Sequence, residues 1–163
     1  MSMLEFGPKR FFQPRTYSIV RDGTPVGEID CDRMWQRATI TIGGASYSAA
    51  REGKMSGAFY LEANGARLAS AERLSAWRGG FTVRAGAATY TLRPASVFGR
   101  TFILAENEAD IGSIARQGFF GSKSRAELPD NLALEIKAFL IWLVITVRQQ
   151  AMVAGVVAGT AGR

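Results

Sequence analysis

Residues 132–150, LALEIKAFLIWLVITVRQQ, decide the fold of this chain. Between residues 138 and 147 a helix built from this stretch is apolar on every face, so it is either surrounded by protein or embedded in lipid. The apolar run is ten residues long, about 15 Å at 1.5 Å per residue, whereas a bilayer core is about 30 Å thick. We therefore predict a core helix over residues 132–149, with a membrane-embedded helix as the alternative.

The sequence just before this helix, LPDN at residues 128–131, ends the preceding strand. Proline interrupts a strand ladder, and Asp130 or Asn131 is suited to cap the first free amide groups of the helix. A helix that is enclosed on all sides needs a sheet wide enough to wrap around it. We expect the rest of the chain to supply that sheet.

The rest of the chain contains an internal repeat. At an offset of 43, residues 38–71 align without gaps on residues 81–114, and at an offset of 42 the stretch from Tyr17 aligns on the stretch from Phe59. A unit of about 42 residues thus occurs nearly three times. Apolar residues alternate with polar ones inside each unit, which is the pattern of β-strands.

Two-residue turns divide each unit into hairpins. Asp-Gly and Asn-Gly pairs favour type I′ turns because both residues tolerate positive φ. Such turns recur at equivalent positions, namely Asp22-Gly23, Asn64-Gly65 and Asn107-Glu108. A two-residue loop predicts the cross-strand pairs Ile19 with Val26, Leu61 with Leu68, and Leu104 with Ile111. Second hairpins are predicted at Gly43-Gly44 and Gly86-Ala87, pairing Ile40 with Tyr47 and Val83 with Tyr90.

These elements predict a mainly β fold of the α+β class. About ten strands lie between residues 17 and 126, and closing ten to twelve antiparallel strands into a barrel around the C-terminal helix removes every exposed sheet edge. We expect an N-terminal arm over residues 1–15, the barrel with its helix over residues 16–150, and a flexible tail over residues 151–163. With 163 residues, one domain is expected.

Composition restricts the chemistry. The net charge of +6 favours anionic partners. With no histidine and only Cys31, a disulfide and a zinc site are excluded, no cofactor is predicted, and a reducing cytoplasmic setting is expected. The first fifteen residues contain no continuous apolar stretch of the kind that a signal peptide needs, so export is not expected.

Three segments of the chain resemble the tubby C-terminal-like superfamily, which includes the LURP-one-related proteins and the phospholipid scramblases. They are YSIVRDGTPVGEI at residues 17–29, YTLRPASVFGRTF at residues 90–102 and LPDNLALEIKAFLIWLVITV at residues 128–147. The resemblance covers about residues 14–150. It implies a twelve-stranded barrel around a central apolar helix, and it implies binding of phosphoinositides or a tethering role at membranes.

The scramblase activity is not carried over by this resemblance. Scramblases are associated with Ca²⁺ and with palmitoylated cysteines, and this chain has neither a cysteine cluster nor an acidic loop before the helix. Asp130 alone does not supply the six or more oxygen ligands that Ca²⁺ takes.

A basic stretch is the candidate binding surface. No acid occurs from residue 73 to residue 105, and Arg84 and Arg93 have the outward parity of one hairpin, where two guanidinium groups can share a face and hold a phosphate. The candidate anion- or lipid-binding residues are Arg84, Arg93, Arg78 and Arg100. The alternative is an ordinary solvated strand face.

Candidate catalytic groups are few. Without histidine, acid-base chemistry would fall to Glu106, Glu108 or Asp110 at one hairpin tip. Cys31 stands between Asp30 and Asp32, and neighbouring negative charge makes a thiol a poor nucleophile. We predict that the protein is not an enzyme.

The sequence thus predicts a non-catalytic binding or scaffold domain that acts at an anionic membrane surface or on a protein partner. Contact with the membrane would be peripheral, nucleic acid is not the expected partner, and the oligomeric state is left open. Two alternatives are a membrane-inserted lipid-handling protein whose helix leaves the barrel, and an enzyme that uses carboxylates.

Overall fold

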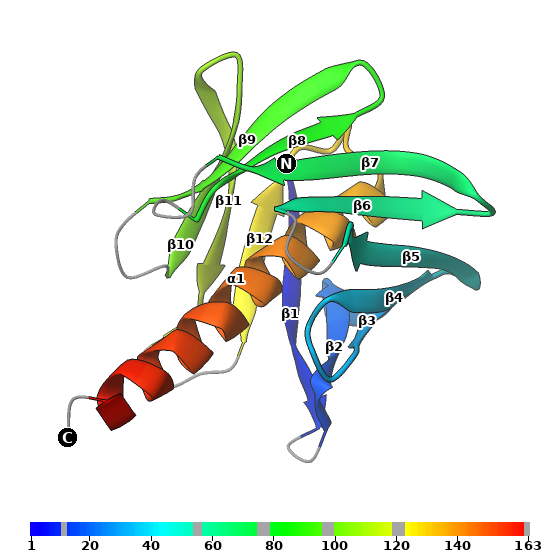
Figure 1. Cartoon of the computed structure of the whole chain (residues 1–163). Helices are drawn as coiled ribbons and strands as arrows, with labels where there is room; N and C mark the ends of the chain where they lie inside the picture. The colour runs from blue at the N-terminus through cyan, green and yellow to red at the C-terminus, as the bar shows by residue number, and fades with distance from the viewer. Residues whose placement is uncertain (11–12, 54–56, 75–78, 96–99, 119–122, 162–163) are drawn as a thin grey trace.

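The structure, a computed structural model, describes residues 1–10, 13–53, 57–74, 79–95, 100–118 and 123–161. It is a closed barrel of twelve antiparallel strands with one C-terminal helix through it (Figure 1). The predicted fold class is therefore confirmed. An antiparallel sheet buries one face only, and here the buried face is the inside of the barrel, where it meets a helix that is apolar all round.

The strands follow one another around the barrel in chain order, and β1 closes it by pairing with both β2 and β12. Their bounds are β1 (Ser2–Arg10), β2 (Gln13–Arg21), β3 (Thr24–Cys31), β4 (Arg37–Ile42), β5 (Ala45–Arg51), β6 (Ala58–Ala63), β7 (Ala66–Arg73), β8 (Phe81–Ala85), β9 (Ala88–Pro94), β10 (Thr101–Glu106), β11 (Ala109–Arg116) and β12 (Ser124–Leu128). Helix α1 spans Leu134–Ala161.

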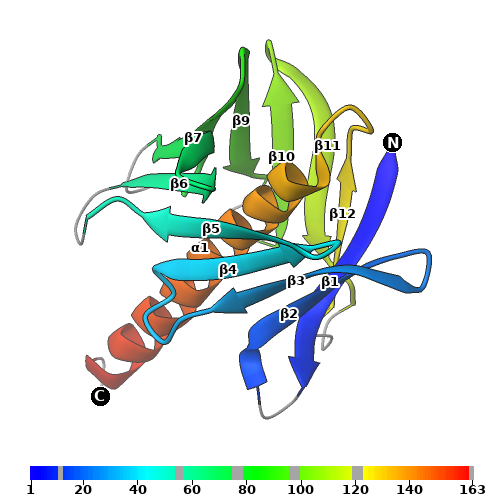
Figure 2. The ribbon, with the colours of Figure 1, turned by 90° about the vertical axis from the view of Figure 1, so that its right-hand side faces the viewer.

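The two ends of the barrel differ. All five predicted two-residue turns lie at one end, here called the turn end, because each connects an even-numbered strand to the next odd-numbered one. Longer connections, such as residues 32–36 between β3 and β4, lie at the opposite end, here called the mouth. Helix α1 begins near the turn end and leaves the barrel through the mouth (Figures 1 and 2).

The turns themselves have the predicted backbone. Both residues have positive φ in Asp22-Gly23, in Asn64-Gly65 and in Asn107-Glu108, as a type I′ turn requires. The second hairpins also have the predicted register, with Ile40 opposite Tyr47 and Val83 opposite Tyr90.

The predicted pairing beyond the first turns is wrong by one residue in all three units. Ile19, Leu61 and Leu104 lie opposite Gly27, Ala69 and Gly112, since a β-bulge intervenes at Val26, Leu68 and Ile111. Each bulge residue is partly buried and packs against the core. A bulge bends its strand and increases the local twist, which helps an antiparallel sheet to close into a barrel.

The predicted domain ends also differ from the structure. The segment expected to be an N-terminal arm, residues 1–15, supplies strand β1 and the start of β2, because unpaired edges on β2 and β12 would otherwise remain. This strand brings the number above the ten that the sequence predicted. At the other end, the segment expected to be a flexible tail continues α1 to Ala161.

The helix begins two residues later than predicted, and the predicted cap Asp130 binds the N-terminal strand instead. The Ala133 carbonyl accepts hydrogen bonds from the amides of Ile136 and Lys137. Asp130 instead accepts hydrogen bonds from the Ser2 hydroxyl at 2.6 Å and from the N-terminal amine at 2.9 Å. The carboxylate of Asp130 thus joins the entry of the helix to β1.

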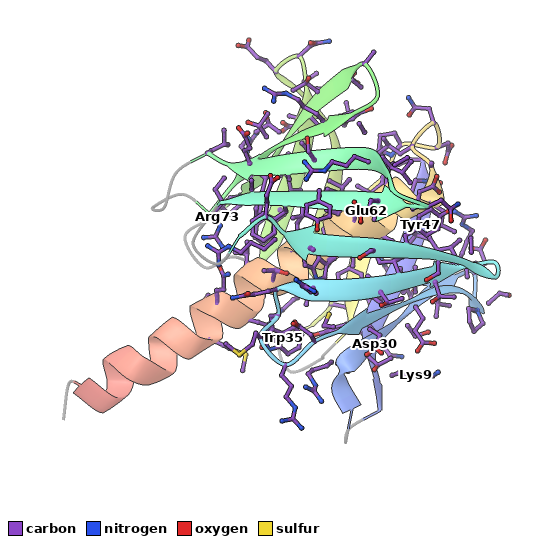
Figure 3. All side chains as sticks on the ribbon, turned by 45° about the vertical axis from the view of Figure 1, so that its right-hand side comes forward. Lys9, Asp30, Trp35, Tyr47, Glu62 and Arg73 are labelled. Carbon is purple, nitrogen blue, oxygen red and sulfur yellow. The ribbon has the colours of Figure 1, made fainter. Side chains whose placement is uncertain are left out.

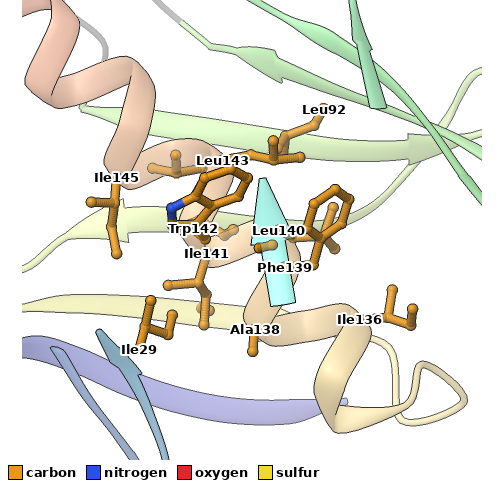
Figure 4. Packing of buried hydrophobic residues seen from close by; sticks show 14 of the residues in the cluster. Ile29, Leu92, Ile136, Ala138, Phe139, Leu140, Ile141, Trp142, Leu143 and Ile145 are labelled. Carbon is orange, nitrogen blue, oxygen red and sulfur yellow. The ribbon is translucent and has the colours of Figure 1, made fainter. Parts of the chain in front are cut away.

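The core is built around Trp142 of the predicted core helix, and this side chain is fully buried (Figure 4). Its ring meets Phe59 edge to face at a centroid distance of 5.7 Å and stacks with Phe139 at 6.1 Å. Phe59 in turn meets Phe81 at 5.5 Å. The same buried cluster contains residues of strands β2–β5, of strands β6–β9 and of strands β10–β12 and β1. The helix is thus enclosed by strands from all three repeat units.

Candidate functional site: an arginine-lined barrel mouth

The two arginines predicted to hold an anion together are separated along their hairpin. Arg84 and Arg93 do share the outer face of the β8–β9 hairpin. Arg84 lies opposite Thr89 near the turn end, however, and Arg93 is four residues farther along β9, which is about 13 Å at 3.3 Å per residue. Arg93 Nη2 is also paired with Asp110 Oδ1 at 2.9 Å. The joint anion site of Arg84 and Arg93 stays a prediction.

The other two predicted residues do not complete that face. Arg78 lies outside the described residues. Arg100 precedes β10 at the mouth, and its carbonyl accepts hydrogen bonds from the backbone amide of Arg116 at 3.1 Å and from the Arg148 side chain at 3.2 Å. Of the predicted set, Arg100 alone belongs to the site described next.

The mouth is lined by arginines at inward-facing strand positions. Along four strands the buried inward positions end, at the mouth, with an arginine two residues beyond the last buried inward side chain, and Arg100 has the corresponding place just before β10. We name these residues, together with the arginine that α1 carries at the same level, the arginine mouth: Arg15, Arg51, Arg73, Arg100, Arg116 and Arg148.

Arg148 is the central member of the arginine mouth because it lies on the helix itself. One guanidinium nitrogen donates to the Ser124 hydroxyl at 2.9 Å and another to the Arg100 carbonyl, whereas its Nε is buried without a partner. Burial, together with the positive charge of Arg116, lowers the pKa of Arg148 to about 10. The group is still protonated at neutral pH, so a charge is held inside the mouth with neutral partners only.

Arg73 repeats this situation across the barrel from Arg148. Figure 3 labels Arg73, which lies at the end of β7. Its guanidinium lies 5.9 Å from the centre of the buried Phe81 ring and donates a hydrogen bond to Gln150 of α1. Its Nε is likewise buried without a partner. Burial and the neighbouring Arg51 both lower the pKa of Arg73. Arg51 itself lies 5.9 Å from the ring centre of Phe59.

In the described part of the chain, no ion pair with a carboxylate engages Arg73 or Arg148. The ion pairs described there engage Lys9, Arg67, Arg93 and the N-terminal amine, all outside the arginine mouth. Glu52, which follows Arg51 in the sequence, pairs with Arg67. Asp32, in the loop after β3, accepts hydrogen bonds from the backbone amides of Gln36 and Arg37. Guanidinium groups that lie near each other, as Arg116 lies near Arg148 and Arg51 near Arg73, are suited to anions with several oxygens, such as phosphate.

The candidate catalytic groups are placed elsewhere. Glu106, Glu108 and Asp110 surround the β10–β11 turn at the turn end, where Asp110 pairs with Arg93. Cys31 is buried, and burial together with Asp30 and Asp32 raises the pKa of its thiol to about 12. Among the described residues no cluster of three or more potential metal ligands is found.

Comparisons with protein-family models, with curated proteins and with solved structures found no match to this chain. The resemblance to tubby-like domains therefore stays a prediction. Within the ranges that the structure describes, no helix carries an apolar stretch long enough to cross a membrane.

The sequence does contain a signal for the arginine mouth, but its residues are not neighbours in the sequence. The acid-free stretch of residues 73–105 groups neighbours in sequence, whereas the mouth gathers one residue from each of several strands. In the repeat, Arg116 follows Arg73 at the same offset of 43 that relates the two units. Extending the inward parity of each strand by one step toward the longer loops would have found the site.

Proposed function

We propose that this protein is a non-catalytic binding domain whose functional surface is the arginine mouth, where it binds phosphate-bearing groups such as the headgroups of anionic phospholipids. The observation that carries the proposal is Arg148, a half-buried cation on the central helix whose described partners are a hydroxyl and a carbonyl. Burying a charge without a counter-charge costs free energy of folding, so a ligand that supplies the negative charge has a reason to bind there.

Neighbouring features support the same proposal. Arg116 repels Arg148, and Arg51 repels Arg73, so the bound anion would relieve two like-charge contacts. The net charge of +6 adds a long-range attraction toward anionic surfaces. A catalytic role has no comparable support, because the acids that would carry it lie at an exposed turn and one of them is neutralised by Arg93.

The proposal can be tested by vesicle flotation. The vesicles consist of phosphatidylcholine alone or with about one-third phosphatidylserine, and the variant Arg116→Gln/Arg148→Gln is compared with the control Arg84→Gln/Arg93→Gln. Both variants remove two positive charges, so they differ in place alone. We expect the anionic vesicles to bind the wild type and the control but not the mouth variant, with binding reduced at high salt because surface attraction is screened beyond about 10 Å at 0.1 M.

Two results would contradict the proposal. Equal loss in both variants would mean that net charge alone drives association. Failure of the wild type to bind anionic vesicles, together with failure of inorganic pyrophosphate to shift its melting temperature, would mean that the arginine mouth holds no phosphate group.

A further inference from the structure

The mouth carries exposed apolar side chains as well as arginines. Three of the large apolar residues that are exposed in the described structure lie at this end: Met34, 71 % exposed, in the loop after β3; Leu74, 50 % exposed, after β7; and Met152, 59 % exposed, on α1. Single exposed apolar residues are common, but three on the same rim beside a protruding helix form a coherent surface.

The helix extends well beyond this rim. After the polar residues Arg148, Gln149 and Gln150, residues 151–161 read AMVAGVVAGTA, with no charged residue. They are helical, and Figures 1 and 2 both show the C-terminal part of α1 continuing outside the strands. Eleven helical residues are about 16 Å long, close to the half-thickness of a bilayer core of about 30 Å.

The order of these features along the helix axis is the order of layers at a membrane surface. The arginine mouth comes first, then the exposed apolar side chains of the rim, and finally an uncharged apolar helix. We propose that the mouth docks on an anionic membrane surface, with the arginine mouth at the phosphate groups and residues 151–161 of α1 inserted into the facing leaflet without crossing it. The inference rests on the proposed function, since the arginines provide the electrostatic part of the attachment.

A second copy of the chain is the competing occupant of this helix. Gly155 and Gly159 have the spacing at which two helices can approach closely. In a parallel pair, however, such an approach would bring two arginine mouths together, and their like charges would repel each other. A negatively charged membrane surface complements the same arginines, so charge complementarity favours the membrane.

The test places an environment-sensitive label on the protruding helix. A nitrobenzoxadiazole group is attached to the variant Val156→Cys and, as a matched control, to Ala87→Cys at the exposed tip of the β8–β9 turn. The buried thiol of Cys31, whose pKa is raised, should react little under the mild conditions that label an exposed cysteine. Phosphatidylcholine vesicles with about one-third phosphatidylserine serve as the membrane, and lipids with quenchers at different acyl-chain depths report the depth of the label.

We expect emission from residue 156 to shift to the blue on binding and to be quenched within one leaflet, and emission from residue 87 to stay unchanged. The unlabelled variant Val156→Glu should bind the same vesicles at least about tenfold more weakly, because moving a charged side chain into the apolar layer costs free energy. Vesicle binding with residue 156 still in water, or with Val156→Glu binding like wild type, would overturn the insertion and leave the proposed function standing.

Two further results would also overturn the inference. Failure of the wild type to bind anionic vesicles would overturn the insertion, and if pyrophosphate also failed to shift the melting temperature, the proposed function would fall with it. A blue shift that appears without vesicles and grows with protein concentration, with a dimer in sedimentation, would assign the helix to a second copy of the chain.

Discussion

Replacing Arg148 by methionine should stabilise the fold while it weakens the function. The pKa of Arg148 falls well below the ordinary value of an arginine, to about 10, which corresponds to about 3 kcal/mol against the charged form in the folded state at about 1.4 kcal/mol per pKa unit. Methionine fills a similar volume without this cost. It also removes two hydrogen bonds, but the Arg100 carbonyl keeps a second donor, the amide of Arg116 at 3.1 Å.

The net change follows from these two contributions. Leaving the buried Ser124 hydroxyl without its donor costs about 1–2 kcal/mol, so Arg148→Met should raise the free energy of unfolding by about 1–2 kcal/mol. Equilibrium urea unfolding measures this as a higher midpoint at an unchanged slope, with the exposed Arg84→Met as a control that changes stability by less than about 0.5 kcal/mol. A loss of more than about 1 kcal/mol would refute the reasoning, since Arg148 would then be a structural residue.

The remaining predictions concern the core, the thiol and a bulge. Leu143→Asp should abolish the cooperative thermal transition, because an unpaired buried charge costs several kcal/mol against a total stability of about 5–15 kcal/mol; a soluble protein that melts cooperatively would contradict the enclosed helix. At pH 9 Cys31 should react with a disulfide reagent at least about a hundredfold more slowly in the native protein than in denaturant, because the folded thiol loses its proton near pH 12 and the unfolded thiol near pH 9; a native rate profile centred near pH 9 would show an exposed thiol. Gly112→Ala should lower the free energy of unfolding by about 2–3 kcal/mol, because its Cβ would stand 2.7 Å from the Glu127 carbonyl oxygen; an unchanged urea midpoint would mean that the strands shift at little cost.

Local rules predicted the features of the fold that depend on neighbours in sequence. Turn pairs such as Asn64-Gly65 need positive φ at both positions, and few other residue pairs adopt it without strain, so the hairpins were readable. The enclosure of Trp142 followed from the all-round apolarity of its helix. These signals do not depend on how distant strands meet.

Features that depend on distant pairing were missed. The bulge at Val26 leaves the turn unchanged and appears only when the strand must bend to close the barrel. Strand β1 pairs with β12, more than a hundred residues away, with Ser2 opposite Leu128. The first residues of the sequence contain no pattern that predicts this pairing. The arginine mouth depends on both, because its members share a rim only once every strand is in register.

Each repeat unit contains an even number of strands, and this has a consequence for how such a site can arise. Each repeat unit holds four strands, β2–β5 and then β6–β9, so the chain finishes a unit at the same end at which it entered. The strands of a duplicated unit therefore run in the same directions as those of the original. Equivalent residues of the two units also face the same side of the sheet. One arginine at an inner terminal position becomes two on a common rim, as Arg73 and Arg116 are, and multivalency for an anionic surface comes with duplication itself.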